Sequence, residues 1–442
     1  MRILYLTHND PRFHPGGTEI FARELFGEVG ARPGTEALFL AGTSGVQRLR
    51  SPGTPFQTVG RSAREMLLWT GEFDRFNLSQ ADTHGVLPEL ERLVRDVKPD
   101  VVHAHHVLLL GLESFAVVRR AAPEARIVLT LHDYYPICHH DGVMVRSAAS
   151  GTPMALCDEA SPDRCLRCVP EASRMAFKLR ELYVKRHLDL VDRFVAPSRF
   201  LADRYIAWGI DPAKITVVRN GRRLSPPAPA RPREERRAEP SFAVFGNVSP
   251  LKGTLLAIQA AQLAASRSNR RFALTIHGAP LFQPKPFVQR LNEAVDAANA
   301  AGNVRVTMAG PYRPEDVAER MRSTDWVVVP SIWWENAPLV IDEAFHHGRP
   351  VLCSDIGGMA EAVTHGVNGL HFRVGDVQAL ASRMLEVMET DDAWETLRQG
   401  LPAARSIQDC ADDHMAVYSP SRALRRRASK AGAKTVCESV PA

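Results

Sequence analysis

The chain has 442 residues, 45% of them hydrophobic and 24% charged, which is ordinary for a soluble globular protein and predicts two or three domains with large cores. No apolar run approaches the ~20 residues that span a bilayer, and residues 1–10 lack the apolar core and cleavage site of a signal peptide, so we expect a cytoplasmic protein. The formal charge of +5 equals that of residues 419–442 alone, where six basic residues accompany one acidic residue; the neutral body therefore argues against a basic nucleic-acid-binding protein.

Strand and helix patterns alternate from the N-terminus. Residues 2–8 form a short apolar run typical of a buried strand, and residues 18–29 carry an apolar helical face behind Thr18, which we expect to cap the helix. Further strands are predicted at 37–42, 100–106 and 125–133, with a helix at 86–97. Strands that are apolar throughout predict a parallel sheet covered on both faces.

Residues 64–78 combine several large apolar side chains with mixed charge. We expect a core helix here. The alternative is a surface that contacts an acceptor or a membrane.

The alternation continues to about residue 221, and residues 223–240 then separate two halves of the chain. This segment is rich in Pro, Arg and Glu, and it predicts a linker without a core strand or a regular helix. A second alternating series follows. We therefore predict an N-terminal domain at 1–222, a linker at 223–240, a C-terminal domain at 241–404 and a C-terminal segment at 405–442 with a basic tail. The tail is expected to be a solvated end, or alternatively to attract anionic lipids.

The fold class predicted from this pattern is α/β, with two Rossmann-like doubly wound domains facing a central cleft. Ligands of such sheets bind outside the carboxyl ends of the strands. In the second half, "WVVVPS" is a predicted strand that ends at a loop carrying Glu335, and a helix is expected from Pro338 to Gly348.

Two glutamates flank the start of this helix. Its free N–H groups and positive dipole end suit a phosphate. Glu335 precedes that end, whereas Glu343 lies roughly 6 Å along the helix axis from Leu339, at about 1.5 Å per residue. The pair could therefore hold the sugar and the ribose of one sugar nucleotide. The alternative is a solvated loop residue and a surface helix residue, but the apolar neighbours of Glu343 argue against a surface face.

The stretch "PSIWWENAPLVIDEAFHHGRPVLCSDIGGMAEAVTHGVNGLHF" resembles the nucleotide-binding signature of family four of the retaining GT-B glycosyltransferases. The resemblance extends over residues 1 to about 418. It implies that Glu335 and Glu343 have the roles just described, and that Asn336, Ala337, Leu339 and Val340 contact the donor. It also implies an acceptor-binding N-terminal domain, retention at the anomeric carbon, no catalytic divalent ion, and a crossover of residues 405–418 back to the first domain.

A second motif, "FGNVSPLKGTLLAIQA", is similar to the family's glycine–lysine segment, in which the lysine neutralises the donor diphosphate. Lys252 matches that lysine; the alternative is a surface lysine. Asn247 stands where the family usually has arginine, and an amide cannot supply the second positive charge. Phosphate binding must then depend on Lys252 and the helix N-terminus, or Arg222 or Arg223 must compensate.

Gly16 and Gly17 lie between the first strand and the first helix, where glycine lets the backbone approach a ligand closely. The alternative is a plain turn, but their position matches the family's glycine loop. His132 ends an apolar strand and matches a family histidine beside the transferred sugar. His103, His105 and His106 are the alternatives for that role, and each of the four could instead be a buried structural histidine.

Four of the seven cysteines lie within 31 residues: Cys138, Cys157, Cys165 and Cys168. Their spacing suits a tetrahedral thiolate site, and we expect structural zinc, with an iron–sulfur cluster as the second choice. His139 and His140 are candidate substitutes. Four unrelated thiols are the remaining alternative.

We expect a retaining glycosyltransferase that moves a sugar from a nucleoside-diphosphate sugar to a glycan or lipid-linked acceptor, with peripheral contact to the inner face of the membrane and no nucleic-acid partner. The alternatives are an inactive sugar-nucleotide-binding scaffold, a zinc-dependent nucleic-acid binder, and an epimerase or phosphorylase on the same scaffold.

Overall fold

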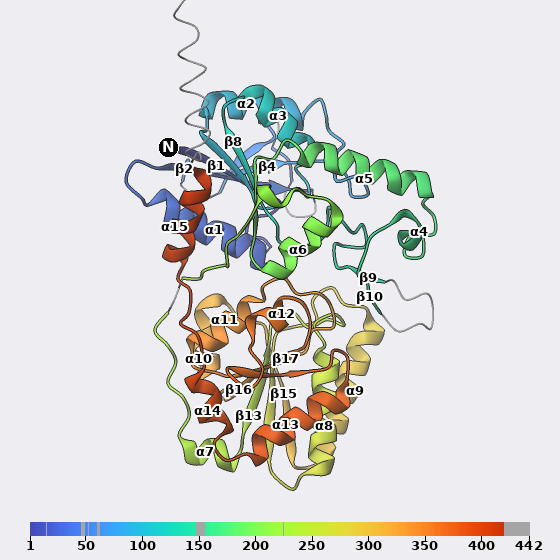
Figure 1. The fold of residues 1–442 in the computed structure, drawn as a ribbon, viewed down its shortest axis with the longest axis vertical. Helices are drawn as coiled ribbons and strands as arrows, with labels where there is room; N and C mark the ends of the chain where they lie inside the picture. The colour runs from blue at the N-terminus through green and yellow to red at the C-terminus, as the bar shows by residue number, and fades with distance from the viewer. Residues whose placement is uncertain are drawn as a thin grey trace, which may run out of the picture.

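The structure is a computed structural model, and it describes residues 1–14, 16–45, 49–51, 53–59, 62–146, 155–223 and 225–419. It has two lobes, each built on its own sheet with helices on both faces (Figure 1). The basic tail predicted beyond residue 419 lies outside the described residues. None of the helices in the described ranges has both the length and the apolar character that crossing a bilayer would require.

The N-terminal lobe contains an eight-stranded sheet in the order β12-β11-β8-β7-β1-β2-β4-β3. All pairs are parallel except β3 with β4. The strands are β1 (Arg2–Thr7), β2 (Glu36–Thr43), β3 (Phe56–Thr58), β4 (Glu65–Trp69), β7 (Val101–Ala104), β8 (Arg126–Thr130), β11 (Arg193–Ala196) and β12 (Ile215–Val217). The covering helices are α1 (Gly17–Gly30), α2 (Val86–Val97), α3 (Glu113–Ala121), α5 (Arg174–Leu188) and α6 (Arg199–Trp208), with a 3₁₀ turn at Pro212–Lys214.

The C-terminal lobe contains a six-stranded, fully parallel sheet in the order β15-β14-β13-β16-β17-β18. Its strands are β13 (Ser241–Phe245), β14 (Phe272–His277), β15 (Val304–Gly310), β16 (Trp326–Val329), β17 (Val351–Ser354) and β18 (Gly369–Phe372). Its helices are α8 (Thr254–Arg267), α9 (Lys285–Ala300), α10 (Val317–Arg322), α11 (Leu339–His346), α12 (Gly357–Ala362), α13 (Val377–Glu389) and α14 (Ala393–Gln399), with a 3₁₀ turn at Pro314–Asp316.

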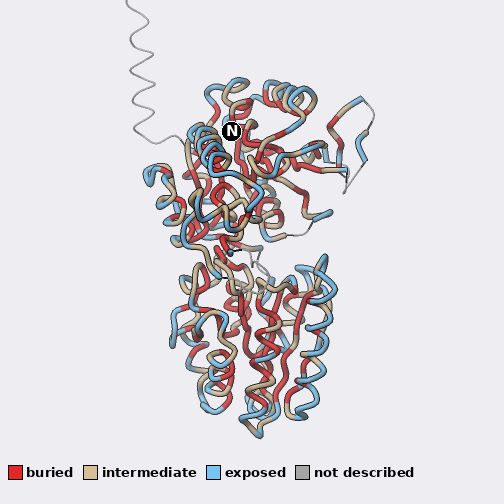
Figure 2. Tube along the Cα trace, turned by 90° about the vertical axis from the view of Figure 1, so that its right-hand side faces the viewer, coloured by how far each residue is buried: buried red, intermediate tan, exposed pale blue. Residues whose placement is uncertain are grey.

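The central strands are buried along their whole length. Every residue of β7, β13, β16 and β17 is buried, and Figure 2 shows buried segments running along the strands of both lobes. Burial on both faces explains the continuous apolar runs, because a parallel sheet covered by helices has no solvent-facing side. The predicted parallel sheets are confirmed.

The last helix returns to the first lobe. α15 (Ile407–Tyr418) packs against α1, and the hydroxyl of Tyr418 lies 3.0 Å from that of Tyr5 and 2.7 Å from Nδ1 of His103. Just before α15, the backbone N–H of Arg222 donates to the carbonyl of Arg405, and Ile407 donates back to Arg222. The two chain segments that connect the lobes are therefore hydrogen-bonded to each other.

Residues 64–78 do not form the predicted core helix. They contain β4 and β5 (Phe73–Asp74), and β5 pairs with β6 (Ser79–Gln80), which follows directly after this range. β4 pairs with β2, and Leu67 and Leu68 are fully buried. A short strand buried on both faces has no polar side, so its apolar run cannot be told from a helix by periodicity. Pairing with β2 decided the outcome.

Two local expectations were also wrong. The predicted linker includes a helix, α7 (Arg233–Ala238), because "REERRA" contains good helix formers after Pro232. Arg236 from this helix stacks on the ring of Trp394 at 3.8 Å. At the start of α1 the cap is Gly16 rather than Thr18, and the helix begins one residue earlier than Thr18, at Gly17.

The cysteine-containing insert leaves the first lobe after β8. It forms a two-stranded ribbon, β9 (Val145–Arg146) with β10 (Ala155–Leu156), and a single turn of helix, α4 (Pro162–Cys165). Residues 147–154 lie outside the described residues.

Candidate active site

The strand orders place a topological switch point in each sheet. In the C-terminal lobe the chain leaves β13 toward β14 and returns to β16 on its other side, so the loops after β13 and β16 begin side by side. In the N-terminal lobe the corresponding strands are β1 and β7. Ligands bind in the crevice at such points.

The two lobes face each other at these points. A Cβ atom on Gly17 would lie 3.6 Å from Cδ1 of Leu339, the first residue of α11. Gly16 and Gly17, after β1, are thus opposite the predicted phosphate-binding helix. Because glycine has no Cβ atom, the backbone of α1 can lie close to this helix end.

Glu335 is the centre of a polar cluster at the β16 loop. It is only 5% exposed, and its Oε1 accepts hydrogen bonds from Nζ of Lys252 at 2.6 Å, Oγ of Ser331 at 2.7 Å and Nε1 of Trp333 at 2.9 Å. A buried carboxylate needs such partners, because an unpaired buried charge is strongly destabilising. The side chains that the sequence assigned to the sugar and the diphosphate are therefore in direct contact.

Lys252 reaches Glu335 from the loop after β13. The backbone turns at Gly253, which has a φ of +68°, and a Cβ atom there would lie 1.9 Å from the carbonyl oxygen of Pro330. Glycine is needed for this close approach of the two loops. Asn247, in the same loop, is exposed. The lysine–glycine pair of the motif thus aims the ammonium group into the cleft.

Glu343 lies one helical turn beyond the start of α11. Its side chain is 17% exposed, and Oε1 is 3.3 Å from a guanidinium nitrogen of Arg222. Burial raises the pKa of Glu343, and Arg222 opposes that shift. Nε of Arg222 also lies 3.5 Å from Glu24 of α1. The structure therefore places Arg222, one of the two candidate compensating cations, beside the predicted ribose-binding carboxylate.

α11 is shorter than predicted. It runs from Leu339 to His346 with Pro338 as its N-cap, so the helical N–H groups at its start belong to Leu339 and Val340. Asn336, Ala337 and Pro338 line a cavity of about 250 Å³ between the lobes. Nδ2 of Asn336 donates to the carbonyl of His132, whereas its Oδ1 is buried without a partner. Asn336 therefore bridges the two lobes.

His132 follows β8 on the opposite wall of the cleft. Its Nε2 is 3.1 Å from Nδ1 of His105, and its ring packs edge-on against Phe21. Burial lowers the pKa of His132 to about 3, so the imidazole is uncharged at neutral pH. An uncharged imidazole can accept or donate one hydrogen bond, but it is not a proton source at that pH.

The three alternative histidines have other partners. His103 is buried between Tyr418 and Thr130, with both contacts at 2.7 Å. Nδ1 of His106 accepts two backbone N–H groups at 3.0 Å, so its proton lies on Nε2, which donates to Asp133 at 2.6 Å. His105 supports His132. Of the four, His132 is the residue whose backbone contacts the β16 loop.

The four insert cysteines all line one cavity. Among the described residues, no group of three or more His, Cys, Asp or Glu side chains is placed to hold a metal ion. The zinc site therefore stays a prediction. His140 donates from Nδ1 to the carbonyl of Val145 at 2.8 Å, and the ring of His139 packs against Phe76.

Several residues of the site were not singled out by sequence. Ser331 and Trp333 donate hydrogen bonds to Glu335. Glu361 of α12 accepts the backbone N–H groups of Arg199 and Phe200 at the start of α6, at 2.8 and 2.7 Å. A Cβ atom on Gly358 would lie 1.8 Å from the carbonyl of Asn336. The "GG" dipeptide was the one available signal, because paired glycines often mark a close backbone approach.

Models of known protein families match nearly the whole chain. A model described as Glycosyltransferase Family 4 matches residues 15–225, and one described as Glycosyl transferases group 1 matches residues 230–401. The chain belongs to this family of glycosyltransferases. The family resemblance read from the sequence is confirmed, and the two matched ranges divide near the start of the predicted linker.

Curated glycosyltransferases match over part of their length. The D-inositol 3-phosphate glycosyltransferase of Nocardia farcinica is 33% identical over 204 residues, which are 44% of this chain and 44% of that protein. The protein of the same name from Thermobispora bispora is 27% identical over 330 residues, or 72% of this chain and 68% of that protein. The chain therefore matches less than half of the length of the Nocardia protein.

Solved structures of glycosyltransferases share the fold. HepE of Anabaena, crystallised with UDP and glucose, superposes with a TM-score of 0.64 at 18% identity, covering 94% of this chain and 99% of that chain. Sucrose-phosphate synthase of Thermosynechococcus elongatus has a TM-score of 0.64 at 17% identity, covering 95% and 98%. The predicted GT-B fold, two Rossmann-like domains facing a cleft, is confirmed.

Proposed function

We propose that this glycosyltransferase moves a sugar from a nucleoside-diphosphate sugar to a glycan or lipid-linked acceptor with retention at the anomeric carbon. The observation that carries the proposal is the contact of Lys252 with Glu335 at the switch point of the C-terminal sheet, opposite His132 and the glycine turn. At this position the ammonium group suits the diphosphate of the donor, and the carboxylate suits the hydroxyl groups of its sugar.

The reaction breaks the bond between the anomeric carbon and the diphosphate, so negative charge develops on the leaving group. We assign its stabilisation to Lys252 and the N–H groups of Leu339 and Val340 at the start of α11. When the diphosphate takes the ammonium group, Glu335 becomes available to accept hydrogen bonds from the sugar. His132, uncharged at neutral pH, contacts the sugar rather than attacking it.

Arg222 supplies the positive charge that Asn247 cannot. Asn247 is exposed, whereas Arg222 already lies 3.3 Å from Glu343 and is mostly buried in the same crevice. In the donor complex we place the ribose hydroxyls on Glu343 and the Arg222 guanidinium on the diphosphate. Fork-shaped donation to phosphate oxygens is a common use of arginine.

A donor panel and one variant test this proposal. UDP-sugars are the first choice, because HepE of Anabaena was crystallised with UDP, and GDP-, ADP- and dTDP-sugars complete the panel. Binding is detected by thermal shift and transfer by product analysis, which also reports retention or inversion. We expect Glu335→Gln to lower kcat/KM by about 10²–10³-fold, the range seen when a group stabilising a transition state is removed.

The control is Glu386→Gln on α13, an exposed glutamate paired with Arg383. It should leave turnover unchanged. Turnover that is equally unaffected by Glu335→Gln would contradict the proposal.

The second candidate is a sugar-nucleotide-binding protein without turnover. Asn247, at the family's arginine position, favours it. It predicts a thermal shift with a sugar nucleotide but no transfer and no hydrolysis, even with varied acceptors.

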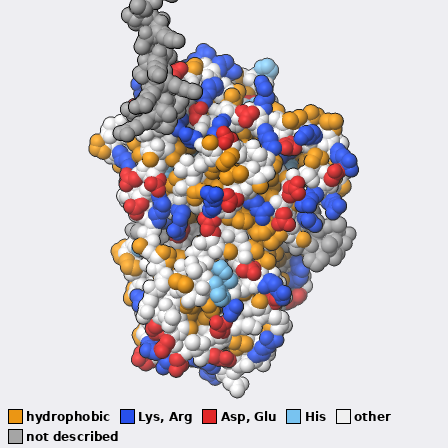
Figure 3. Space-filling model, in the orientation of Figure 1, with side chains coloured by type: hydrophobic (Ala, Val, Ile, Leu, Met, Phe, Trp, Pro, Cys, Tyr) orange, Lys and Arg blue, Asp and Glu red, His pale blue; other side chains and the backbone are white. Residues whose placement is uncertain are grey.

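Membrane contact, which we include in the proposal, is supported by α5 rather than by residues 64–78. Met175, Leu179 and Leu182 are 54–64% exposed and lie on one face of this helix, which also carries Arg174, Lys178 and Arg186. Figure 3 shows hydrophobic and basic side chains together at the edge of the N-terminal lobe that α5 forms. Apolar and basic side chains on one helix suit an anionic lipid surface.

Sedimentation with vesicles tests the contact. We expect the chain to bind vesicles containing anionic lipid, and Leu179→Glu with Leu182→Glu to abolish binding without changing transfer to a soluble acceptor. Equal sedimentation of the double variant would contradict this assignment.

A further inference from the structure

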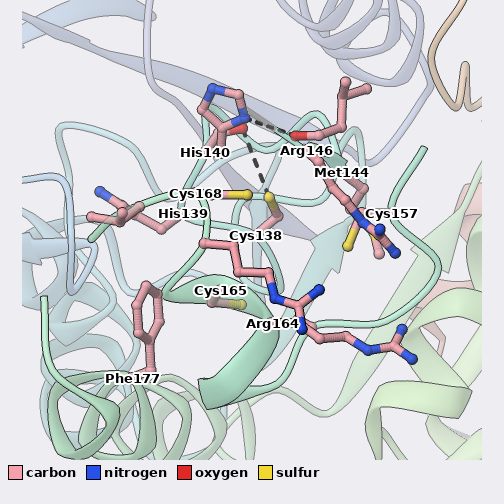
Figure 4. Close-up of a pocket in the computed structure, with 14 residues that line it drawn as sticks. Cys138, His139, His140, Met144, Arg146, Cys157, Arg164, Cys165, Cys168 and Phe177 are labelled. Carbon is pink, nitrogen blue, oxygen red and sulfur yellow. Dashed lines mark hydrogen bonds between the residues drawn. The ribbon is translucent and has the colours of Figure 1, made fainter. Parts of the chain in front are cut away.

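The insert of the N-terminal lobe encloses a cavity of about 210 Å³ whose walls carry four thiols (Figure 4). Cys138 comes from the loop after β8, Cys157 follows β10, Cys165 ends α4, and Cys168 lies in the turn after it. All four are partly buried. Three separate chain segments therefore direct thiols into one enclosed space.

The remaining walls of the cavity are partly apolar and partly basic. Val145, Val169 and Phe177 form the apolar lining, and Arg146, Arg164 and Arg167 line the same space. All three arginines are exposed, and Arg164 pairs with Glu159 at 3.5 Å. A centre held by four thiolates carries net negative charge, and arginines at its edge would compensate that charge.

The insert itself contains little regular structure. In its described part the regular structure is one two-residue ribbon and one helical turn. Short elements of this kind do not bury enough apolar surface to be stable alone, and such excursions are commonly stabilised by a metal.

We propose that Cys138, Cys157, Cys165 and Cys168 bind a metal centre as thiolates. Each thiol releases one proton to solvent on binding, so four thiols and a Zn²⁺ ion, or four thiols and a [4Fe–4S]²⁺ core, give a dianionic centre and four protons. No electron is transferred. Zinc and an iron–sulfur cluster share this ligand chemistry.

The two centres require different spacings of the four thiolates. A tetrahedral zinc ion with bonds of about 2.3 Å brings its sulfur ligands to about 3.8 Å from one another. A cluster of four iron and four sulfide atoms is larger and holds its thiolates further apart. The four thiols line one cavity, and within the described ranges no three candidate ligands are grouped around a single ion, so metal analysis decides between the two centres.

Direct contacts connect the proposed centre with the active site. The carbonyl of Cys157 accepts a hydrogen bond from Nε1 of Trp334 at 3.1 Å, and Trp334 precedes Glu335. Arg204 also links the insert to Trp334. It donates to the carbonyl of Asp158 at 2.6 Å and stacks on the Trp334 ring at 4.5 Å. The backbone of one metal ligand thus positions the residue next to Glu335.

From this we infer a role for the centre, which rests on the proposed function: it positions the Trp334–Glu335 loop and takes no part in the chemistry. Its loss should lower kcat/KM for transfer by about tenfold, because a small displacement of a positioned group weakens catalysis strongly. Trp334 is a positioning residue in the same sense.

Metal analysis of the full chain, purified without oxygen and without affinity metals, tests the site. Iron and acid-labile sulfide in equal amounts, with the visible absorption of a cluster, would support the thiolate centre and identify it as an iron–sulfur cluster. One equivalent of zinc without iron would support it as a zinc site. Absence of both metals, with all four thiols titratable in the folded protein, overturns the proposal.

Variants separate the site from general stability. Cys165→Ser and Cys168→Ser should each lose most of the metal, whereas Cys410→Ala, a buried cysteine of α15 far from the insert in the sequence, should retain it. If the serine variants do not fold, the native chain is stripped with a chelator and then given iron with sulfide, or zinc alone, and metal uptake is measured directly. No uptake by a chain that remains folded overturns the proposal.

Trp334→Phe tests the positioning role. It should retain the metal and lower kcat/KM by about tenfold, while Cys168→Ser loses metal and activity together. Full activity of the metal-free chain overturns the role but leaves the metal site intact. A chain that binds metal yet transfers no sugar from any donor contradicts the proposed function alone.

Discussion

At the scale of the residue, the cleft contains more charge than its sequence motif suggests. The family arginine is replaced by Asn247, yet Arg222 lies beside Glu343 from the segment that joins the lobes. A charge-assisted hydrogen bond contributes about 1.5–3 kcal/mol, which corresponds to at least a tenfold effect on affinity.

We therefore predict that Arg222→Gln weakens UDP binding by at least about tenfold, measured by calorimetry. Adding Asn247→Arg to this variant should recover part of the loss, because Asn247 is exposed and has room for a longer side chain. Arg373→Gln, at an exposed arginine paired with Asp376, is the control. An unchanged Kd for Arg222→Gln would show that Arg222 does not serve the diphosphate.

Buried histidines make the folded state sensitive to acid. Burial lowers the pKa of His132 to about 3 and that of His414 to about 4, below the value of about 6.5 in the unfolded chain. The unfolded chain therefore takes up protons first as the pH falls. Stability is present above about pH 6.5 and is lost on acidification toward pH 4, because the state that binds more protons is then favoured.

We expect the free energy of unfolding to fall by up to about 1.4 kcal/mol per pH unit for each such histidine in this window. Urea unfolding at several pH values measures the slope. His414→Gln should reduce this slope by the contribution of one histidine. The same slope in that variant would contradict the assignment of His414 as a buried neutral group.

At the scale of the element, α15 is held to the first lobe by specific polar contacts as well as by apolar packing. The hydroxyl of Tyr418 contacts both Tyr5 and His103, and all three side chains are fully buried. Removing that hydroxyl leaves two buried polar atoms without this partner, and each such loss is destabilising by about 1–3 kcal/mol.

Tyr418→Phe is therefore expected to lower the free energy of unfolding by about 2–6 kcal/mol, the sum for the two groups, measured by denaturant titration. Asp412→Asn in the same helix is the matched control. Its ion pair with Arg32 is exposed on the aspartate side, and such pairs contribute about 0–1 kcal/mol. Equal effects of the two variants would argue that packing alone attaches α15.

At the scale of the whole molecule, the closed cleft depends on a few contacts between the lobes. Glu361 of α12 accepts the N–H groups of Arg199 and Phe200 at the start of α6. A carboxylate at a helix N-terminus contributes about 0.3–1 kcal/mol, or up to about fivefold in a closing equilibrium. Asn336 and Tyr134 add contacts across the same cleft.

Glu361→Ala should favour an open arrangement of the lobes. We expect a larger radius of gyration in solution scattering and a donor KM raised by about two- to fivefold, with kcat nearly unchanged. Scattering curves and KM identical to those of the parent chain would show that this contact does not hold the cleft closed.

Sequence by itself determined the fold class and most of the order of the elements, because continuous apolar strands and helix periodicity are local patterns. From the spacing of Glu335 and Glu343 and the family resemblance it also predicted the two carboxylates and the cation of the site. It misjudged residues 64–78 and the start of α1, where pairing with β2 and a backbone cap decided the structure. Tertiary structure alone brought Lys252 onto Glu335, Arg222 onto Glu343 and Trp334 onto Cys157. These pairs join residues 83, 121 and 177 positions apart, and no local pattern records which distant side chains the two sheets will bring together.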